Sequence, residues 1–98
     1  MSNFSFEWDP NKNISNCSKH GISFEEARTS FTDEFARYIS DPDHSDIEER
    51  FILMGTSIES RLLIVCHCIR DEEIIRIISA RKADKKERQI YETFRYAQ

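Results

Sequence analysis

Residues 62–82 read LLIVCHCIRDEEIIRIISARK, in which a short charged turn separates two apolar runs. The first run, Leu62–Ile69, is interrupted only by His67, as expected for a central strand that is buried on both faces. The second run, Ile74–Ala80, predicts a neighbouring strand, and Asp71-Glu72 suits the turn between the two. These residues predict the centre of an antiparallel sheet.

Outward from this centre, the flanking sequence predicts three more strands. Aromatic and polar residues alternate from Phe4 to Trp8, which is the period of a short, half-buried strand. Two other apolar segments are bounded by turn residues, as strands usually are. These segments are Tyr38-Ile39 and Arg50–Ile58.

A first helix is expected directly after Trp8. Asp9 can accept hydrogen bonds from the free N–H groups of a helix start, and Pro10 fits the first turn, where it loses no hydrogen bond. Gly21 suits the left-handed position that follows a helix end. We therefore expect this helix to run from Pro10 to about Lys19.

Two capping patterns predict two further helices. Ser23 with Glu26 forms a Ser-x-x-Glu capping box, and Asp84 with Glu87 forms a similar pattern later in the chain. Apolar residues of the final helix fall on one side of it. They are Ile90, Tyr91, Phe94 and Ala97.

The expected element order is β-α-α-β-β-β-β-α, an α+β fold with helices packed on an antiparallel sheet. Neither a repeat nor a linker interrupts the chain, so residues 1–98 are expected to form a single domain. The N-terminus lacks the features of a signal peptide, and no run approaches the ~18 apolar residues that cross a bilayer. We therefore expect a cytoplasmic protein with no membrane contact.

The charge of the chain is unevenly distributed. A net charge of −4 argues against an RNA-binding role, because phosphate contacts need lysine and arginine. Residues 76–88, however, contain six basic and two acidic residues, a local charge of +4. This basic patch suits an anionic ligand, although charge that only keeps a helix start soluble explains it equally well.

Cysteine and acidic residues do not predict a metal site. Cys66 and Cys68 flank His67, which an extended strand directs to the opposite face, and no fourth ligand has the usual spacing. An acidic cluster lacks the glycine and distal glutamate of a calcium loop, so we interpret it as a turn. We expect reduced thiols, no metal and no cofactor. The acidic cluster comprises Asp41, Asp43, His44 and Asp46.

Candidate groups for metal-free RNA cleavage are present. Attack of a 2′-hydroxyl on the neighbouring phosphorus needs a proton acceptor, a proton donor and cations for the developing charge. His20 lies at the expected end of the first helix, and an imidazole side chain can give or take a proton. The alternative is a histidine that only satisfies the last carbonyl groups of its helix.

Three arginines are candidates for the cations. Arg76 interrupts an apolar strand, where a charge is costly unless it is paired or faces a ligand, and Arg81 ends the same strand. A regular strand directs positions 76 and 81 to opposite faces, so the two share a site only if the strand bends or ends before Arg81. Arg50 opens another strand. Structural ion pairing and protection of a strand edge are the alternatives for Arg76 and Arg50.

Segments along nearly the whole chain resemble the BrnT toxin family. The similarity follows motifs that occur in order from the N-terminus onward, and it continues at Glu87 and Tyr91. The motifs are Phe6-Glu7-Trp8-Asp9-Pro10-Asn11-Lys12, Lys19-His20-Gly21-Ile22-Ser23-Phe24-Glu25-Glu26-Ala27, Asp41-Pro42-Asp43-His44, Glu49-Arg50-Phe51 and Ile75-Arg76-Ile77-Ile78-Ser79-Ala80-Arg81.

The resemblance implies a RelE-like fold and the toxin role in a bacterial toxin-antitoxin system. The implied activity is an endoribonuclease that arrests translation, and the implied partner is a BrnA-like antitoxin that also binds DNA. The other function that the sequence allows is a non-catalytic module that binds a protein or nucleic acid. The implied catalytic residues are His20, Arg50, Arg76 and Arg81, with Lys12, Lys19, Lys82 and Lys85 as RNA-binding candidates.

Overall fold

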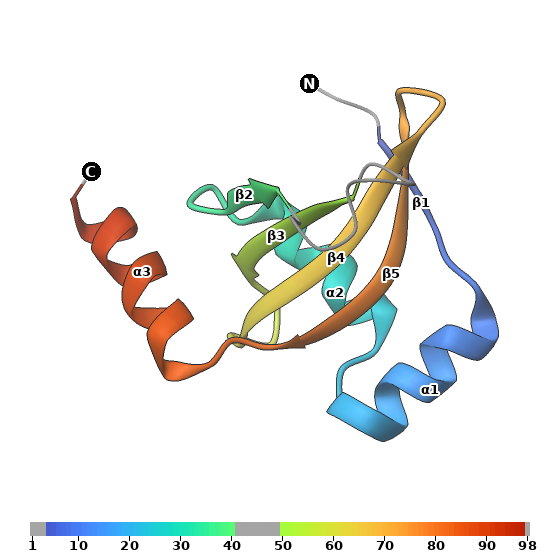
Figure 1. The fold of residues 1–98 in the computed structure, drawn as a ribbon, viewed down its shortest axis with the longest axis horizontal. Coiled ribbons are helices and arrows are strands. Elements are labelled where there is room, and N and C mark those ends of the chain that lie inside the picture. The colour runs from blue at the N-terminus through green and yellow to red at the C-terminus, as the bar shows by residue number, and fades with distance from the viewer. Residues whose placement is uncertain (1–3, 41–49, 98) are drawn as a thin grey trace.

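The computed structural model describes residues 4–40 and 50–97. The acidic turn expected from Asp41 to Asp46 lies outside these residues. The described chain is an α+β fold with one sheet, and Figure 1 shows its course. Its elements are β1 (Ser5–Glu7), α1 (Pro10–His20), α2 (Phe24–Thr29), the 3-10 helix η1 (Ser30–Thr32), β2 (Arg37–Ser40), β3 (Phe51–Thr56), β4 (Leu62–Arg70), β5 (Ile74–Lys82) and α3 (Lys85–Tyr96).

The sheet has the strand order β1-β5-β4-β3-β2, so the apolar strand β4 lies at its centre as predicted. The strands β2 to β5 are antiparallel, but β1 pairs in parallel with β5. The expectation of a wholly antiparallel sheet was therefore wrong. Strands joined by a short hairpin must run antiparallel. Most of the chain lies between β1 and β5, so the connection allows β1 to run in either direction.

The helix α1 begins and ends as the sequence predicts. Asp9 accepts a hydrogen bond of 2.8 Å from the N–H of Asn11, and Gly21 follows the helix at φ 72°. The buried side chain of Asn16 fastens α1 to the edge of β5. Its amide donates to the carbonyl of Ala80 at 2.8 Å and accepts from the N–H of Ala80 at 3.1 Å. Because β1 pairs with β5 only as far as Arg76, Asn16 satisfies backbone groups that would otherwise be buried without partners.

The main core lies between α2 and one face of the sheet. Phe24 and Ala27 of α2 pack with Leu53, Val65 and Ile77 of the central strands, and all five side chains are buried. The 3-10 helix also lies very close to this face. A Cβ atom on Gly55 would come within 2.7 Å of the backbone oxygen of Ser30, so only glycine fits there.

The two predicted capping boxes have different outcomes. At α3 the box is complete, because Asp84 and Glu87 each bond to the backbone N–H of the other. At α2 only half of it forms: Ser23 accepts from the N–H of Glu26 at 3.0 Å, but the carboxylate of Glu26 bonds to Ser57 and Arg61. A guanidinium partner offers this buried carboxylate a stronger bond than a backbone N–H does.

The helix α3 extends from the end of β5, far from α1 (Figure 1). Tyr91 is its one buried residue and packs against Met54, Leu62 and Ile64 on the sheet face opposite α2. Ile90, expected on the same apolar side, is 46% exposed. Among the described residues, no helix is long and apolar enough to cross a membrane.

A bulge in β5 decides the positions of its two arginines. Cys66 pairs with Ser79 and His67 with Ile77, so Ile78 is an extra residue in the β5 strand. An extra residue reverses the alternation of side chains beyond it. Arg76 and Arg81 therefore point to the same face of the sheet. Strand alternation alone would separate them, and the bulge is the irregularity that lets the two arginines share one site.

Candidate functional site

The predicted arginines gather on the sheet face opposite α2, which we call the arginine face. Directly paired residues of neighbouring strands project from the same face, so the register defines rows across it. One row runs through Cys68 and Arg76 to Glu7. Phe51 pairs with His67, and continuing that register by one residue places Arg50 beside Cys68 in the same row. In this register Arg50 and Arg76 lie on the same face of the sheet, on either side of Cys68.

Two further rows complete the arginine face. The middle row is mainly apolar, and the far row ends in an arginine at each side. Row members are Ile39, Ile52, Cys66 and Ser79 in the middle, and Arg37, Met54, Ile64 and Arg81 beyond them. Arg76 pairs with Cys68 and Arg81 with Ile64, four residues apart on β4, so the two arginines lie roughly 13 Å apart along the sheet. An extended anionic chain could contact both ends at once.

Glu7 pairs with two arginines at the first row. Its carboxylate accepts hydrogen bonds from Arg76 at 3.0 Å and from Arg70 at 2.8 Å. The bond from Arg76 contributes most to holding the pKa of Glu7 below its usual value, with burial acting against it and Arg70 adding to it. Two cations share one carboxylate, so the group keeps a net positive charge. It also keeps N–H donors for a further anion.

Arg81 forms a bidentate ion pair at the start of α3. Its two terminal nitrogens donate to the two carboxylate oxygens of Glu87, each at 2.8 Å. The same contact lowers the pKa of Glu87, against the effect of burial. The side chain of Arg81 remains 43% exposed. The pair orients the guanidinium next to the N-terminus of α3 and leaves it accessible to solvent.

His20 lies on another element, at the last position of α1. It is half-buried and follows Asn16 by four residues, which places it one turn further on the same helix face. Asn16 bonds to the backbone of Ala80, the neighbour of Arg81, so α1 lies beside the Arg81 end of β5. Within residues 4–40 and 50–97, no hydrogen bond or ion pair joins His20 to Arg76 or Arg81.

The predicted RNA-binding lysines are all exposed. Two lie on α1, one ends β5 and one opens α3. Lys82, the last residue of β5, lies close enough to Glu26 to help lower the pKa of that carboxyl, after the larger effects of Arg61 and Ser57. In order, these lysines are Lys12, Lys19, Lys82 and Lys85.

His67, which only interrupted an apolar run in the sequence, is fully buried beside aromatic rings. Its ring centroid lies 4.9 Å from that of Phe31, 5.7 Å from Tyr38 and 6.1 Å from Phe51. Burial lowers the pKa of His67, and a 3.2 Å contact between Nδ1 and the carbonyl of Val65 opposes the shift. Nε2 has no hydrogen-bond partner in the described chain. A neutral core histidine on the face opposite Arg76 is not a candidate for the RNA site.

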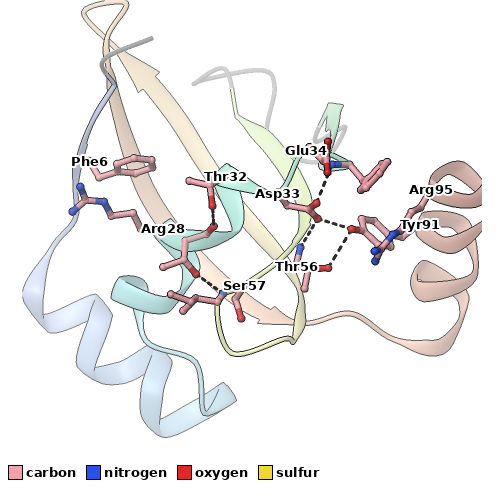
Figure 2. A pocket seen from close by; sticks show the side chains of 12 residues that line it. Phe6, Arg28, Thr32, Asp33, Glu34, Thr56, Ser57, Tyr91 and Arg95 are labelled. Carbon is pink, nitrogen blue, oxygen red and sulfur yellow. Dashed lines mark hydrogen bonds between the residues drawn. The ribbon is translucent and has the colours of Figure 1, made fainter. Parts of the chain in front are cut away.

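A hollow of about 880 Å³ lies between η1, the β3–β4 turn and α3 (Figure 2). None of the predicted site residues lines it. Asp33 at its centre accepts hydrogen bonds from the hydroxyl of Tyr91 at 2.5 Å and from the N–H of Thr56 at 2.8 Å. Burial raises the pKa of Asp33, but these bonds and one from the N–H of Phe35 outweigh it and leave the pKa below its usual value.

The chemistry of this hollow is that of an anchor for α3. Burial and the neighbouring carboxylate raise the pKa of Tyr91, so its phenol stays protonated and keeps its bond to Asp33. Figure 2 shows Arg28 and Arg95 at opposite ends of the hollow. Each guanidinium stacks on a ring, that of Arg28 over Phe6 and that of Arg95 over Phe35, both at 5.1 Å. Sequence reasoning missed this network because its members come from three distant segments.

The described chain holds no cluster of three or more histidine, cysteine or acidic side chains that suits a metal ion. Cys17 is exposed, Cys66 is half-buried and Cys68 is buried, and all three are free thiols.

Comparisons with known proteins identify one family model and one similar fold. Residues 8–87 match the model of the family described as "Ribonuclease toxin, BrnT, of type II toxin-antitoxin system". The crystal structure of the Brucella abortus ribonuclease toxin, BrnT, is similar to this chain with a TM-score of 0.62 and 21% sequence identity. The alignment covers 85% of this chain and 100% of that one. Comparison with curated proteins gives no match.

Proposed function

Because the chain belongs to the BrnT family of ribonuclease toxins of type II toxin-antitoxin systems, we propose that it is a metal-independent endoribonuclease of the cytoplasm. Cleavage of RNA by this protein arrests translation, and a BrnA-like antitoxin neutralises it in a hetero-oligomeric complex. We also assign the fold to the RelE-like class. The observation that carries the proposal is the placement of Arg50, Arg76 and Arg81 on one face of the sheet.

Each candidate group has a role in cleavage by the 2′-hydroxyl. The guanidinium group of Arg81, oriented by Glu87, holds the scissile phosphate and stabilises the charge that develops on its oxygens. Arg50 and Arg76 bind a neighbouring phosphate further along the RNA. His20 exchanges the proton, as base toward the 2′-hydroxyl or as acid toward the leaving oxygen. This role requires the RNA to lie across the Arg81 end of the arginine face.

The acidic net charge is compatible with RNA binding. Five of the 18 acidic residues fall within residues 41–49, which contain neither lysine nor arginine. Without those five negative charges, the net of −4 becomes +1 for the rest of the chain. The acidity therefore belongs largely to one short segment, and the remaining surface does not repel RNA as a whole.

The test is cleavage of a labelled single-stranded RNA by the purified protein in excess EDTA. Full activity in the chelator, with 2′,3′-cyclic phosphate or 2′/3′-phosphate product ends, is the expected result. Activity that disappears in EDTA and returns with magnesium or manganese contradicts the mechanism. Products with 5′-phosphate ends also contradict it, since the 2′-hydroxyl cannot then be the nucleophile.

Ion pairing of the arginines favours a second candidate function, a module that binds RNA or a protein without cleaving it. Arg76 is paired with Glu7 and Arg81 with Glu87, and such pairs also occur as purely structural contacts. RNA binding without any cleavage, in the same assay and at saturating protein, supports this function over catalysis.

A further inference from the structure

A second hollow, of about 500 Å³, lies between α3 and the first residue of β2. On the α3 side it is lined by Lys86, Ile90, Phe94 and Ala97, and Arg37 forms the β2 side. The spacing of four, four and three residues places the α3 members on one helix face. We call this hollow the α3 groove.

The α3 groove is separate from the contacts that attach α3 to the protein. Tyr91 enters the core on a neighbouring helix face and bonds to Asp33 and Thr56. Ile90 remains 46% exposed although it is a large apolar side chain. The contacts of Tyr91 therefore attach α3 to the core without using Ile90, which lines the open α3 groove.

Arg37 gives the α3 groove a fixed wall. Its guanidinium lies over the ring of Phe94 with 4.4 Å to the ring centroid, which joins β2 to α3. A cation stacked on an aromatic face keeps its N–H edges available to an anion. The groove is thus formed in the isolated chain and does not require α3 to move.

The charge of the lining indicates the partner. Arg37 and Lys86 are cations, and no carboxylate lines the α3 groove. The hollow of Figure 2, by contrast, carries Asp33 and Glu34 among its lining residues. An apolar floor with a basic rim complements a segment that presents apolar side chains flanked by carboxylates.

We propose that the α3 groove binds an acidic amphipathic helix of the antitoxin, with apolar side chains against Ile90 and Phe94 and carboxylates at Lys86 and Arg37. This inference rests on the proposed function, since it takes the chain to be a toxin with an antitoxin partner. An apolar stripe at helical spacing matches a second helix laid along it. RNA fits less well, because two cations around an apolar floor offer little to a continuous row of phosphates.

Occupation of the α3 groove also explains inhibition. Arg37 belongs to the row of the arginine face that ends in Arg81, and Glu87 ties Arg81 to the first turn of α3. An acidic helix in the groove therefore occupies the Arg37 end of this row, and its carboxylates repel an RNA strand that approaches the row. Binding and inhibition are then produced by the same contact.

The test measures binding of the antitoxin encoded with this toxin to purified toxin variants, by biolayer interferometry. Ile90→Glu introduces a charge on the groove floor and should weaken the complex by at least ~30-fold, as loss of an interface hot spot does. Ile14→Glu is the matched control, because Ile14 is 68% exposed on α1, remote from α3. Lys86→Glu should slow association with the antitoxin and reduce the salt dependence of the association rate. Lys86→Arg keeps the positive charge and should leave both at their wild-type values.

Thermal melting of each variant shows that it is folded, and a half-exposed position such as Ile90 should tolerate the exchange. Equal antitoxin affinity of Ile90→Glu and Ile14→Glu overturns the inference while leaving the proposed function intact. Loss of RNA affinity instead of antitoxin affinity in Ile90→Glu assigns the groove to RNA and overturns it too. If the wild-type chain is a dimer and Ile90→Glu converts it to a monomer, the groove binds a second copy of this chain, and the inference is overturned. A wild-type chain that neither binds antitoxin nor cleaves RNA overturns the proposed function as well.

Discussion

Replacement of Arg81 by alanine separates a structural role of this residue from an RNA-binding one. The exchange removes both hydrogen bonds to Glu87. Because Arg81 is 43% exposed, solvent screens the pair, and its loss should lower the free energy of unfolding by only about 0.5–1 kcal/mol. For a chain of this size, that corresponds to a melting temperature lower by roughly 2–8 °C. We therefore expect Arg81→Ala to remain folded.

The effect on RNA should be larger than the effect on stability. Removal of one phosphate contact should reduce the slope of log affinity against log salt by about 0.7 for a single strand. The assay is fluorescence anisotropy of a labelled 2′-O-methyl RNA, which cannot be cleaved by its own 2′-hydroxyl, at several salt concentrations. Melting is followed by circular dichroism on the same samples.

Glu87→Gln is the matched control for Arg81→Ala. Glutamine keeps the capping contact with the N–H of Asp84 but removes the negative charge beside Arg81. This variant should melt like Arg81→Ala and bind RNA at least as tightly as the wild type. The reasoning is refuted if Arg81→Ala lowers the melting temperature by more than about 10 °C while RNA affinity and salt slope stay at the wild-type values.

Three further predictions concern the contacts around the site. Asn16→Ala removes both hydrogen bonds to Ala80 and should lower the free energy of unfolding by about 2–4 kcal/mol in a urea titration; an unchanged midpoint contradicts this. Tyr91→Phe removes the bond to Asp33 and should cost about 1.5–3 kcal/mol at pH 7. The pKa of Asp33 is lowered in the folded state, so the difference in unfolding free energy between Tyr91→Phe and wild type should shrink as the pH falls through this folded-state pKa. A difference that stays constant with pH argues against a bond to the ionised carboxylate. The pKa of His67 is also lowered, so its contribution to stability is complete above the unfolded-state value of about 6.5 and is lost as the pH falls. In His67→Phe the free energy of unfolding should therefore decline less as the pH falls. Parallel curves of unfolding free energy against pH for variant and wild type would exclude the explanation.

Local signals predicted the helices and the central strands well. Asp9, Pro10 and Gly21 define α1 through contacts within a few residues, and the structure contains those contacts. The capping box of Asp84 and Glu87 is local in the same sense. At α2 the local signal was only half right, because Glu26 has a stronger partner in Arg61, far along the chain.

Long-range features of the site could not be predicted from the sequence. The bulge at Ile78 depends on the register between β4 and β5, and strand periodicity alone placed Arg76 and Arg81 on opposite faces. The parallel pairing of β1 depends on packing across the whole chain. Candidate residues could be proposed from the sequence, but the arrangement of the arginines on one face could not.

The catalytic claim depends most directly on His20. The decisive measurement is the single-turnover rate of RNA cleavage at saturating protein in EDTA, for wild type and for His20→Gln. Loss of a general acid or base should lower the rate constant by at least ~100-fold while RNA affinity stays unchanged. An unchanged rate constant in His20→Gln contradicts the assignment of proton transfer to His20 and leaves the arginines without their catalytic partner.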